Sequence, residues 1–149
     1  EAGGADWKGC YFHHPLYSSA KRHGSDARLR KLLEPVFVKY GVDVVLAGHD
    51  HVYERLLPQQ GISYFVEGAS GQLRAGNLAP SALTAKGFDA DRSFMLIEFA
   101  GDEMYFQAVS RAGVTARFAA TSAAVGPSPA TVVRCITRRY RLSSHGRPR

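Results

Sequence analysis

Two histidines separated by one residue lie in residues 48–51, which read Gly-His-Asp-His. The preceding residues, 42–47, form an almost continuous apolar run, as in a strand covered on both faces. In extended backbone, side chains at positions i and i+2 point to the same face, so His49 and His51 can converge on one metal ion or on two adjacent ions. Imidazole nitrogen is a common ligand for zinc, iron and manganese. The spacing therefore predicts a metal site at the end of this strand.

A second pair of histidines, His13 and His14, lies earlier in the chain. It follows an aromatic, strand-like run over residues 7–12 and precedes Pro15, which cannot continue the hydrogen-bond ladder of a strand. Two histidine clusters at strand ends in one small domain indicate a shared site.

Three segments occur in a specific order. They are residues 13–18 (His-His-Pro-Leu-Tyr-Ser), residues 40–43 (Tyr-Gly-Val-Asp) and residues 48–55 (Gly-His-Asp-His-Val-Tyr-Glu-Arg). With this order and spacing, residues 7–74 resemble the C-terminal half of a calcineurin-like metallophosphoesterase, in its purple-acid-phosphatase-like branch. The resemblance implies hydrolysis of phosphate monoesters or diesters by a metal-bound hydroxide, at a site of two metal ions. The metals would be iron, zinc or manganese, and the sequence does not distinguish them.

The same resemblance implies roles for individual histidines. His13 and His49 would bind the second, more exchangeable metal, and His51 the first. In the family, the metal ligand is the first residue of a His-x-Pro pattern, which favours His13. His14 stays unassigned: its side chain could face the substrate or pack against neighbouring residues. His23 would contact the phosphate and protonate the leaving group, a role suited to a side chain that titrates near neutrality. An exposed loop histidine without a catalytic role is an equally weighted alternative for His23.

The family's earlier motifs are Asp-x-His, Gly-Asp-x-x-Asp or -Tyr, and Gly-Asn-His-Glu or -Asp, and none precedes the histidine segments here. We therefore expect a fragment of a larger enzyme that carries the histidine ligands but not the bridging carboxylate. Imidazoles without anionic ligands should bind metal weakly, so we expect the isolated chain to be inactive.

A net charge of +6 suggests a different class of function. Residues 134–149 contain six arginines and no carboxylate, so they account for the whole excess. An alternative reading is a basic module that binds nucleic acid through this tail. We favour a solvated tail because no combined aromatic and basic surface accompanies the arginines. A structural zinc domain is disfavoured because neither Cys10 nor Cys135 is spaced to complete a closed site.

The remaining pattern predicts the elements that position these residues. Apolar side chains three and four residues apart predict a helix that ends at Tyr40, with Ser25 or Asp26 as its N-cap, Gly41 as its C-cap, and a kink or break at Pro35. We expect strands over residues 7–12, 42–47, 62–67, 94–100 and 104–109, and a long loop over residues 69–92.

We therefore predict an α/β (α+β) fold, the truncated C-terminal half of the metallophosphoesterase β-sandwich flanked by helices. Residues 1–110 would form the phosphoesterase part and residues 111–149 a disordered, low-complexity, arginine-rich tail. No apolar run approaches the ~20 residues of a membrane span. The expected partner is a phosphate ester, without nucleic acid, and surfaces exposed by truncation could cause self-association. The resemblance weakly favours an exported or periplasmic location.

Overall fold

A computed structural model describes residues 7–121 of the chain. Within them lie one helix and eight strands. In chain order these are β1 (Gly9–Phe12), α1 (Ala27–Tyr40), β2 (Val44–Ala47), β3 (Tyr53–Leu56), β4 (Ser63–Glu67), β5 (Thr84–Phe88), β6 (Ser93–Ala100), β7 (Glu103–Ser110) and β8 (Gly113–Thr121).

Five of the strands form a mixed sheet in the order β1-β2-β4-β3-β5. Strands β1, β2 and β4 run parallel, whereas β3 is antiparallel to both of its neighbours. The central strands are covered on both faces, which explains why β2 is apolar along its whole length. Because β1 and β2 are parallel neighbours, the loops that follow them leave the sheet at the same edge.

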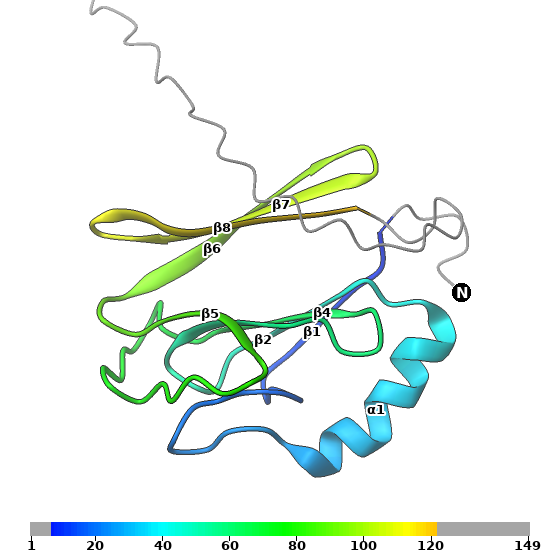
Figure 1. Ribbon diagram of the computed structural model, residues 1–149, viewed down its shortest axis with the longest axis horizontal. Coiled ribbons are helices and arrows are strands. Elements are labelled where there is room, and N and C mark those ends of the chain that lie inside the picture. Colours follow the sequence, from blue (N-terminus) through cyan, green and yellow to red (C-terminus); the bar gives the residue numbers. More distant parts are fainter. Residues whose placement is uncertain (1–6, 122–149) are drawn as a thin grey trace, which may run out of the picture.

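The other three strands form an antiparallel sheet in the order β6-β7-β8. Along β7, buried side chains alternate with partly exposed ones, as expected where one face packs on a core. The β6–β7 turn contains Gly101 with φ 62°, a backbone conformation that glycine adopts without steric cost. The five-stranded sheet lies between α1 and this second sheet (Figure 1). The predicted α+β fold class, a sandwich of two sheets, is confirmed, and α1 is the helix that flanks it within the described residues.

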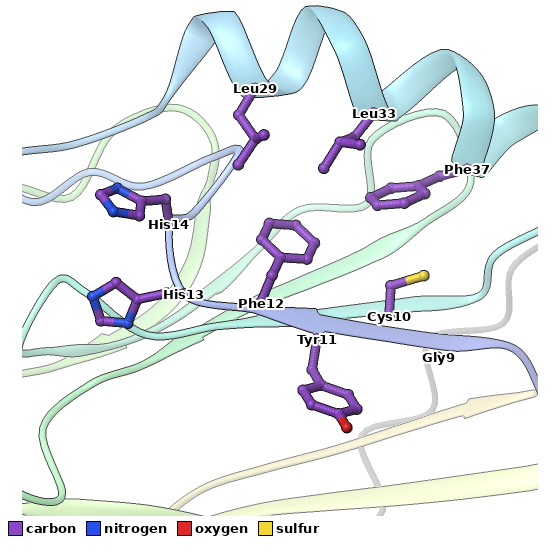
Figure 2. A pocket seen from close by; sticks show the side chains of 9 residues that line it. All are labelled: Gly9, Cys10, Tyr11, Phe12, His13, His14, Leu29, Leu33 and Phe37. Carbon is purple, nitrogen blue, oxygen red and sulfur yellow. The ribbon is translucent and has the colours of Figure 1, made fainter.

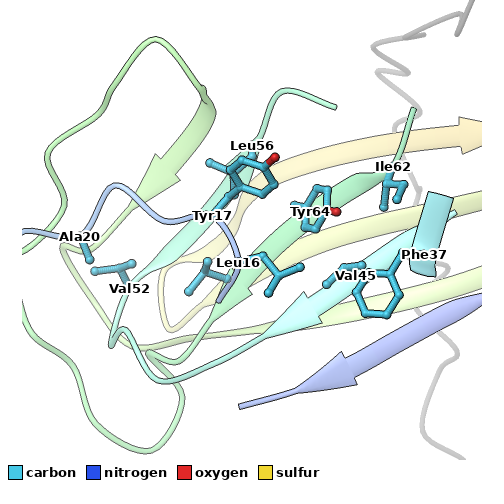
Figure 3. Close-up of a cluster of buried hydrophobic side chains, with 10 residues drawn as sticks. Leu16, Tyr17, Ala20, Phe37, Val45, Val52, Leu56, Ile62 and Tyr64 are labelled. Carbon is cyan, nitrogen blue, oxygen red and sulfur yellow. The ribbon is translucent and has the colours of Figure 1, made fainter. Parts of the chain in front are cut away.

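The core has two parts, one on each face of the five-stranded sheet. Adjacent residues Val44 and Val45 of β2 belong to different parts because successive side chains of a strand point to opposite faces. The part on the α1 side, drawn in Figure 3, consists of Leu16, Tyr17, Ala20, Phe37, Val45, Val52, Leu56, Ile62, Tyr64 and Val66. The part between the sheets consists of Val44, Tyr53, Phe65, Met104, Phe106, Ala108 and Phe118.

Helix α1 has the predicted ends. The carboxylate of Asp26 accepts a hydrogen bond of 2.9 Å from the backbone N–H of Leu29, so Asp26 and not Ser25 is the N-cap. Gly41 ends the helix in the left-handed conformation, with φ 63°. Pro35 lies inside one continuous helix, so the predicted break into two segments was wrong. Its side chain is exposed, on the side of the helix away from the core.

Three strands were not predicted. β3 directly follows the second histidine loop, β5 interrupts the predicted long loop of residues 69–92, and β8 lies at the start of the predicted tail. β8 pairs with β7 along its length, so residues 113–121 are part of the second sheet. Its small and polar residues hid it, because their pattern reads as low complexity. The rest of the predicted tail, including its arginines, lies outside the described residues, and the division at residue 110 stays a prediction.

Residues 101–105 read Gly-Asp-Glu-Met-Tyr and so have the spacing of one of the family's early motifs. In the fold they form the β6–β7 turn and the start of β7. The carbonyl of Gly101 accepts a hydrogen bond of 3.2 Å from the indole N–H of Trp7, just before β1 begins. The histidines follow the other end of β1, so this segment does not supply their carboxylate. No helix among the described residues is long and apolar enough to cross a bilayer.

Candidate metal centre

The two histidine loops start side by side. In the parallel register of β1 and β2, Phe12 lies opposite Ala47, the last residue of β2. The ladder continues for one more bond, in which the backbone N–H of Gly48 donates to the carbonyl of His13 at 3.1 Å. Parallel neighbours end at a common sheet edge, so histidines 36 positions apart meet there.

His13 and His49 are in direct contact. Nε2 of His13 lies 3.1 Å from Nδ1 of His49, and their ring planes are nearly perpendicular. One proton between the two nitrogens would satisfy this distance. A metal ion would also satisfy it, because two nitrogens bound tetrahedrally at the usual zinc–nitrogen length lie roughly 3.3 Å apart. The geometry therefore suits both a hydrogen bond and a pair of ligands.

Two further imidazoles complete the cluster around His49. The ring of His14 stacks on that of His49, with centroids 4.1 Å apart and planes 28° apart. The ring of His23 approaches His49 to 4.4 Å, from the loop that precedes α1. The predicted residues His13, His23 and His49 are thus brought together. His14, which the sequence left unassigned, joins them, and His13, His14 and His49 form a group whose donor nitrogens all lie within 4.8 Å of one another.

The prediction that His49 and His51 point to the same face was wrong, because the backbone is not extended there. His49 has φ 61°, the left-handed region that non-glycine residues rarely adopt. It lies in a bend after β2, and this conformation directs its ring toward His13 and His14. His51 is not in the three-imidazole group, and its Nδ1 is buried without a hydrogen-bond partner among the described residues. The metal roles predicted for His13, His49 and His51 remain predictions.

Asp50, between these two histidines, is completely buried. Its Oδ2 accepts a hydrogen bond of 2.6 Å from the hydroxyl of Ser18, which in turn accepts from the backbone N–H of Ala20 at 3.2 Å. Ser18 belongs to the first histidine loop and Asp50 to the second, so this bond fixes one loop against the other.

Glu54, the second residue of β3, is another carboxylate that contacts the first histidine loop. Glu54 is completely buried. Its carboxylate accepts hydrogen bonds of 2.7 Å from the backbone N–H of Ser19 and 2.6 Å from the hydroxyl of Thr84. The guanidinium of Arg55 lies over the ring of Phe118 at 4.3 Å, because alternate residues of β3 face opposite sides. Glu54 therefore ties the first histidine loop to the five-stranded sheet.

Gly68 allows the second histidine loop to pack closely on the end of β4. A Cβ atom at this position would lie 2.3 Å from the backbone oxygen of Asp50, a distance that only displacement of backbone could relieve. Its own N–H donates to the carbonyl of Val52 at 3.1 Å. The backbone on both sides of His51 is thus positioned by a residue that no motif included.

Electrostatics favour the neutral form of His49. Its partial burial lowers its pKa, and the charges of His14, His23 and His13 lower it further, while Asp50 acts in the opposite direction. A neutral imidazole keeps the lone pair that a metal ion needs. The cluster therefore holds its central histidine in the form that binds metal.

The cluster borders an open groove between β1 and α1, with a volume of about 600 Å³. Figure 2 shows Cys10 and Phe12 pointing from β1 toward Leu33 and Phe37 of α1, with His13 and His14 beyond the end of the strand. Tyr11 points to the other side of the sheet and is 85% exposed. The groove floor is apolar, so polar recognition in this region is confined to the histidine edge.

This donor set suits the histidine half of a metal centre. Three imidazoles share one small volume, and a fourth has a buried nitrogen without a hydrogen-bond partner among residues 7–121. The group contains no carboxylate, since Asp50 and Glu54 are engaged elsewhere. A bridging anionic ligand is therefore not provided by the cluster itself.

Comparison with known proteins gives consistent results. Residues 1–53 match the model of the calcineurin-like phosphoesterase family. Tartrate-resistant acid phosphatase type 5 of Oryctolagus cuniculus is 44% identical over 57 residues, which cover 38% of this chain and 17% of that protein. Purple acid phosphatase 1 of Ipomoea batatas is 34% identical over 79 residues, covering 52% and 17%. Fe(3+)-Zn(2+) purple acid phosphatase 12 of Arabidopsis thaliana is 46% identical over 59 residues, covering 39% and 13%.

A solved structure shares the fold. It is described as GAP50, the anchor in the inner membrane complex of Plasmodium, and aligns with a TM-score of 0.67 at 23% identity, covering 76% of this chain and 36% of that one. The chain spans less than a fifth of the length of the curated relatives named above.

Fold and site together define a metallophosphoesterase-type α+β sandwich with a histidine-rich edge. More specifically, the matched segments are similar to calcineurin-like phosphoesterases of the purple acid phosphatase type, which confirms the resemblance seen in the sequence.

Proposed function

We propose that the protein containing this chain is a metallophosphoesterase that hydrolyses phosphate esters at a centre of two metal ions, and that this chain supplies the histidine ligands. The observation that carries the proposal is the 3.1 Å contact between Nε2 of His13 and Nδ1 of His49. These two residues are the ligands that the resemblance implied, and they come from the ends of adjacent parallel strands.

In this proposal, His13 and His49 hold one ion and His51 the other. Ions held by these residues would supply charge stabilisation for an in-line displacement and would lower the pKa of a bound water toward ~7. The metals would be iron, zinc or manganese. The relative from Arabidopsis thaliana named as an Fe(3+)-Zn(2+) enzyme supports a mixed pair, without deciding the metals of this protein.

His23 is the proposed proton donor to the leaving oxygen. It is exposed, lies 4.4 Å from His49 between ring centroids, and so can reach a phosphate bound at the metal edge. A histidine titrates near neutral pH, which suits this step. Ser18 and Asp50 would act only by positioning, since their hydrogen bond holds the two histidine loops together.

The isolated chain is proposed to lack this activity, because its histidine group contains no carboxylate. The proposed substrate is a phosphate monoester or diester, and the proposed location of the protein is exported or periplasmic. The open apolar groove beside β1 is the proposed route to self-association.

The test uses the full protein that contains this chain, with His49→Ala and His51→Ala compared with the unaltered enzyme. We expect each variant to lose bound metal by elemental analysis, and to lose phosphate-ester hydrolysis by at least about 100-fold, because ligands are removed. Lys31→Ala, an exposed change on α1, is the control. Full metal content in both histidine variants would contradict the assignment. His23→Ala should retain metal but lose activity.

A further inference from the structure

We propose that His14 is itself a metal ligand, and that His13, His14 and His49 together hold one divalent cation through three imidazole nitrogens. The inference rests on the metal centre of the proposed function and goes beyond it in two ways. It gives a ligand role to a residue that the family resemblance left unassigned, and it gives the 149-residue chain a binding site that needs no carboxylate.

The first argument is distance. The donor nitrogens of the three residues all lie within 4.8 Å of one another, and two of them are 3.1 Å apart. Nitrogens bound to one zinc ion at its usual bond length lie roughly 3.3 Å apart. The third nitrogen must therefore move inward by at most about 1.5 Å, which a side-chain rotation can provide.

The second argument is freedom to make that rotation. His13 and His14 are exposed and His49 is partly buried, so no packed core resists a change in their rings. Their backbone, in contrast, is anchored. The carbonyl of the buried residue Pro15 accepts a hydrogen bond of 2.8 Å from the N–H of Asp26 at the start of α1. Anchored backbone with adjustable rings allows a cluster to close on an ion.

The third argument is the contrast with His23. Both His14 and His23 lie with ring centroids within 4.4 Å of His49. His14 also contacts His13, at 5.1 Å between centroids, and belongs to the three-donor group, whereas His23 does not. Distance to His49 alone thus does not distinguish His14 from His23 as a ligand. The two differ because only His14 has a donor nitrogen close to those of both His13 and His49.

The chemistry of the donor atoms limits which divalent cations the site can bind. Three neutral imidazoles with a remaining open position suit zinc or cobalt, whereas magnesium and calcium prefer oxygen ligands. The proposed site should therefore discriminate strongly between these two classes of divalent ion.

The test is the affinity of the 149-residue chain for zinc, measured by titration calorimetry, with cobalt absorption spectra to report nitrogen coordination. His14→Phe retains a ring that can stack on His49 but removes both nitrogens. His23→Phe is the matched control, with the same chemical change at the other ring beside His49. We expect one zinc per chain, no competition by millimolar magnesium, and a loss in His14→Phe greater than the roughly 10–100-fold loss typical when a hydrogen-bond partner of a ligand is removed.

His23→Phe should bind zinc within a few-fold of the unaltered chain, and the cobalt spectrum should change only in His14→Phe. Equal zinc affinities for His14→Phe and the unaltered chain would overturn the inference. His49→Ala separates this failure from failure of the proposed function. If His49→Ala abolishes binding while His14→Phe does not, only the role of His14 is wrong. If neither change affects binding, the metal centre of the proposed function fails as well.

Discussion

The two faces of the five-stranded sheet are built differently. On the face toward β6–β8, the rings of Phe65 and Phe106 stack 4.4 Å apart, and Phe118 packs against both. On the face toward α1, the core includes a polar network in which the hydroxyl of Tyr17 donates to Glu34 at 2.5 Å. That face also has the open groove beside β1, with the histidines at its end.

The closed face mainly stabilises the fold, whereas the open face carries the residues that could do chemistry. The closed face excludes water and is held by aromatic packing, so changes there should act on folding. The open face leaves histidine nitrogens accessible and keeps one residue, His49, in a costly backbone conformation. Changes at that edge should affect metal and substrate more than folding.

The largest effect should come from the closed face. Phe106→Ala removes a fully buried ring from the aromatic stack and should lower the free energy of unfolding by about 3–5 kcal/mol. Leu33→Ala, which removes a partly buried side chain at the groove, should cost only about 1–2 kcal/mol. Urea denaturation of both variants measures the comparison. Equal losses would show that the two faces stabilise the fold equally.

An intermediate effect should come from Glu67, which joins the two sheets. Its carboxylate accepts hydrogen bonds of 3.1 and 3.2 Å from the hydroxyl of Ser93 in β6. Burial raises its pKa from the usual 4.5 to about 7, although the hydrogen bonds from Ser93 and the N–H of Ala69 act in the opposite direction. The folded state therefore holds the proton more tightly than the unfolded state. This stabilisation is complete below pH 4.5 and is lost as the pH rises through 7.

We expect the unaltered chain to lose on the order of 1–3 kcal/mol of stability between pH 5 and pH 8 through this one group. Glu67→Gln, which is neutral at both values, should remove that part of the loss. Denaturation curves for both proteins at the two pH values isolate the contribution of Glu67 from that of the histidines. Parallel pH dependences would mean that Glu67 does not titrate between them.

The smallest effect should come from the open edge. His49→Gly places glycine where φ is 61°, and should stabilise the chain by about 0.5–1 kcal/mol while abolishing metal binding. His49→Ala removes the same imidazole but keeps the strained backbone, so it is the matched control. Thermal unfolding in the presence of a chelator measures both. If the two variants unfold at the same temperature, His49 does not store backbone strain.

Much of the fold could be read from local patterns. The caps at Asp26 and Gly41 and the apolar run of β2 each depend on residues close together in the chain, and each was predicted close to its true position. β3, β5 and β8 were missed because polar or small residues interrupt their apolar ones, and each segment becomes a strand only by pairing with a neighbour. Pro35 could break a helix locally, but its exposed position lets α1 continue.

By itself, the sequence determined the resemblance to the family and the residues that could bind metal, because ligand types and their order are local properties of the chain. Tertiary structure alone decided which nitrogens converge. The parallel pairing of β1 and β2 sets His13 beside His49, and the left-handed backbone of His49 turns its ring toward His14. Burial of Asp50 and Glu54 likewise depends on contacts across the fold, since the spacing of residues in the chain does not predict which carboxylates are exposed and which are buried.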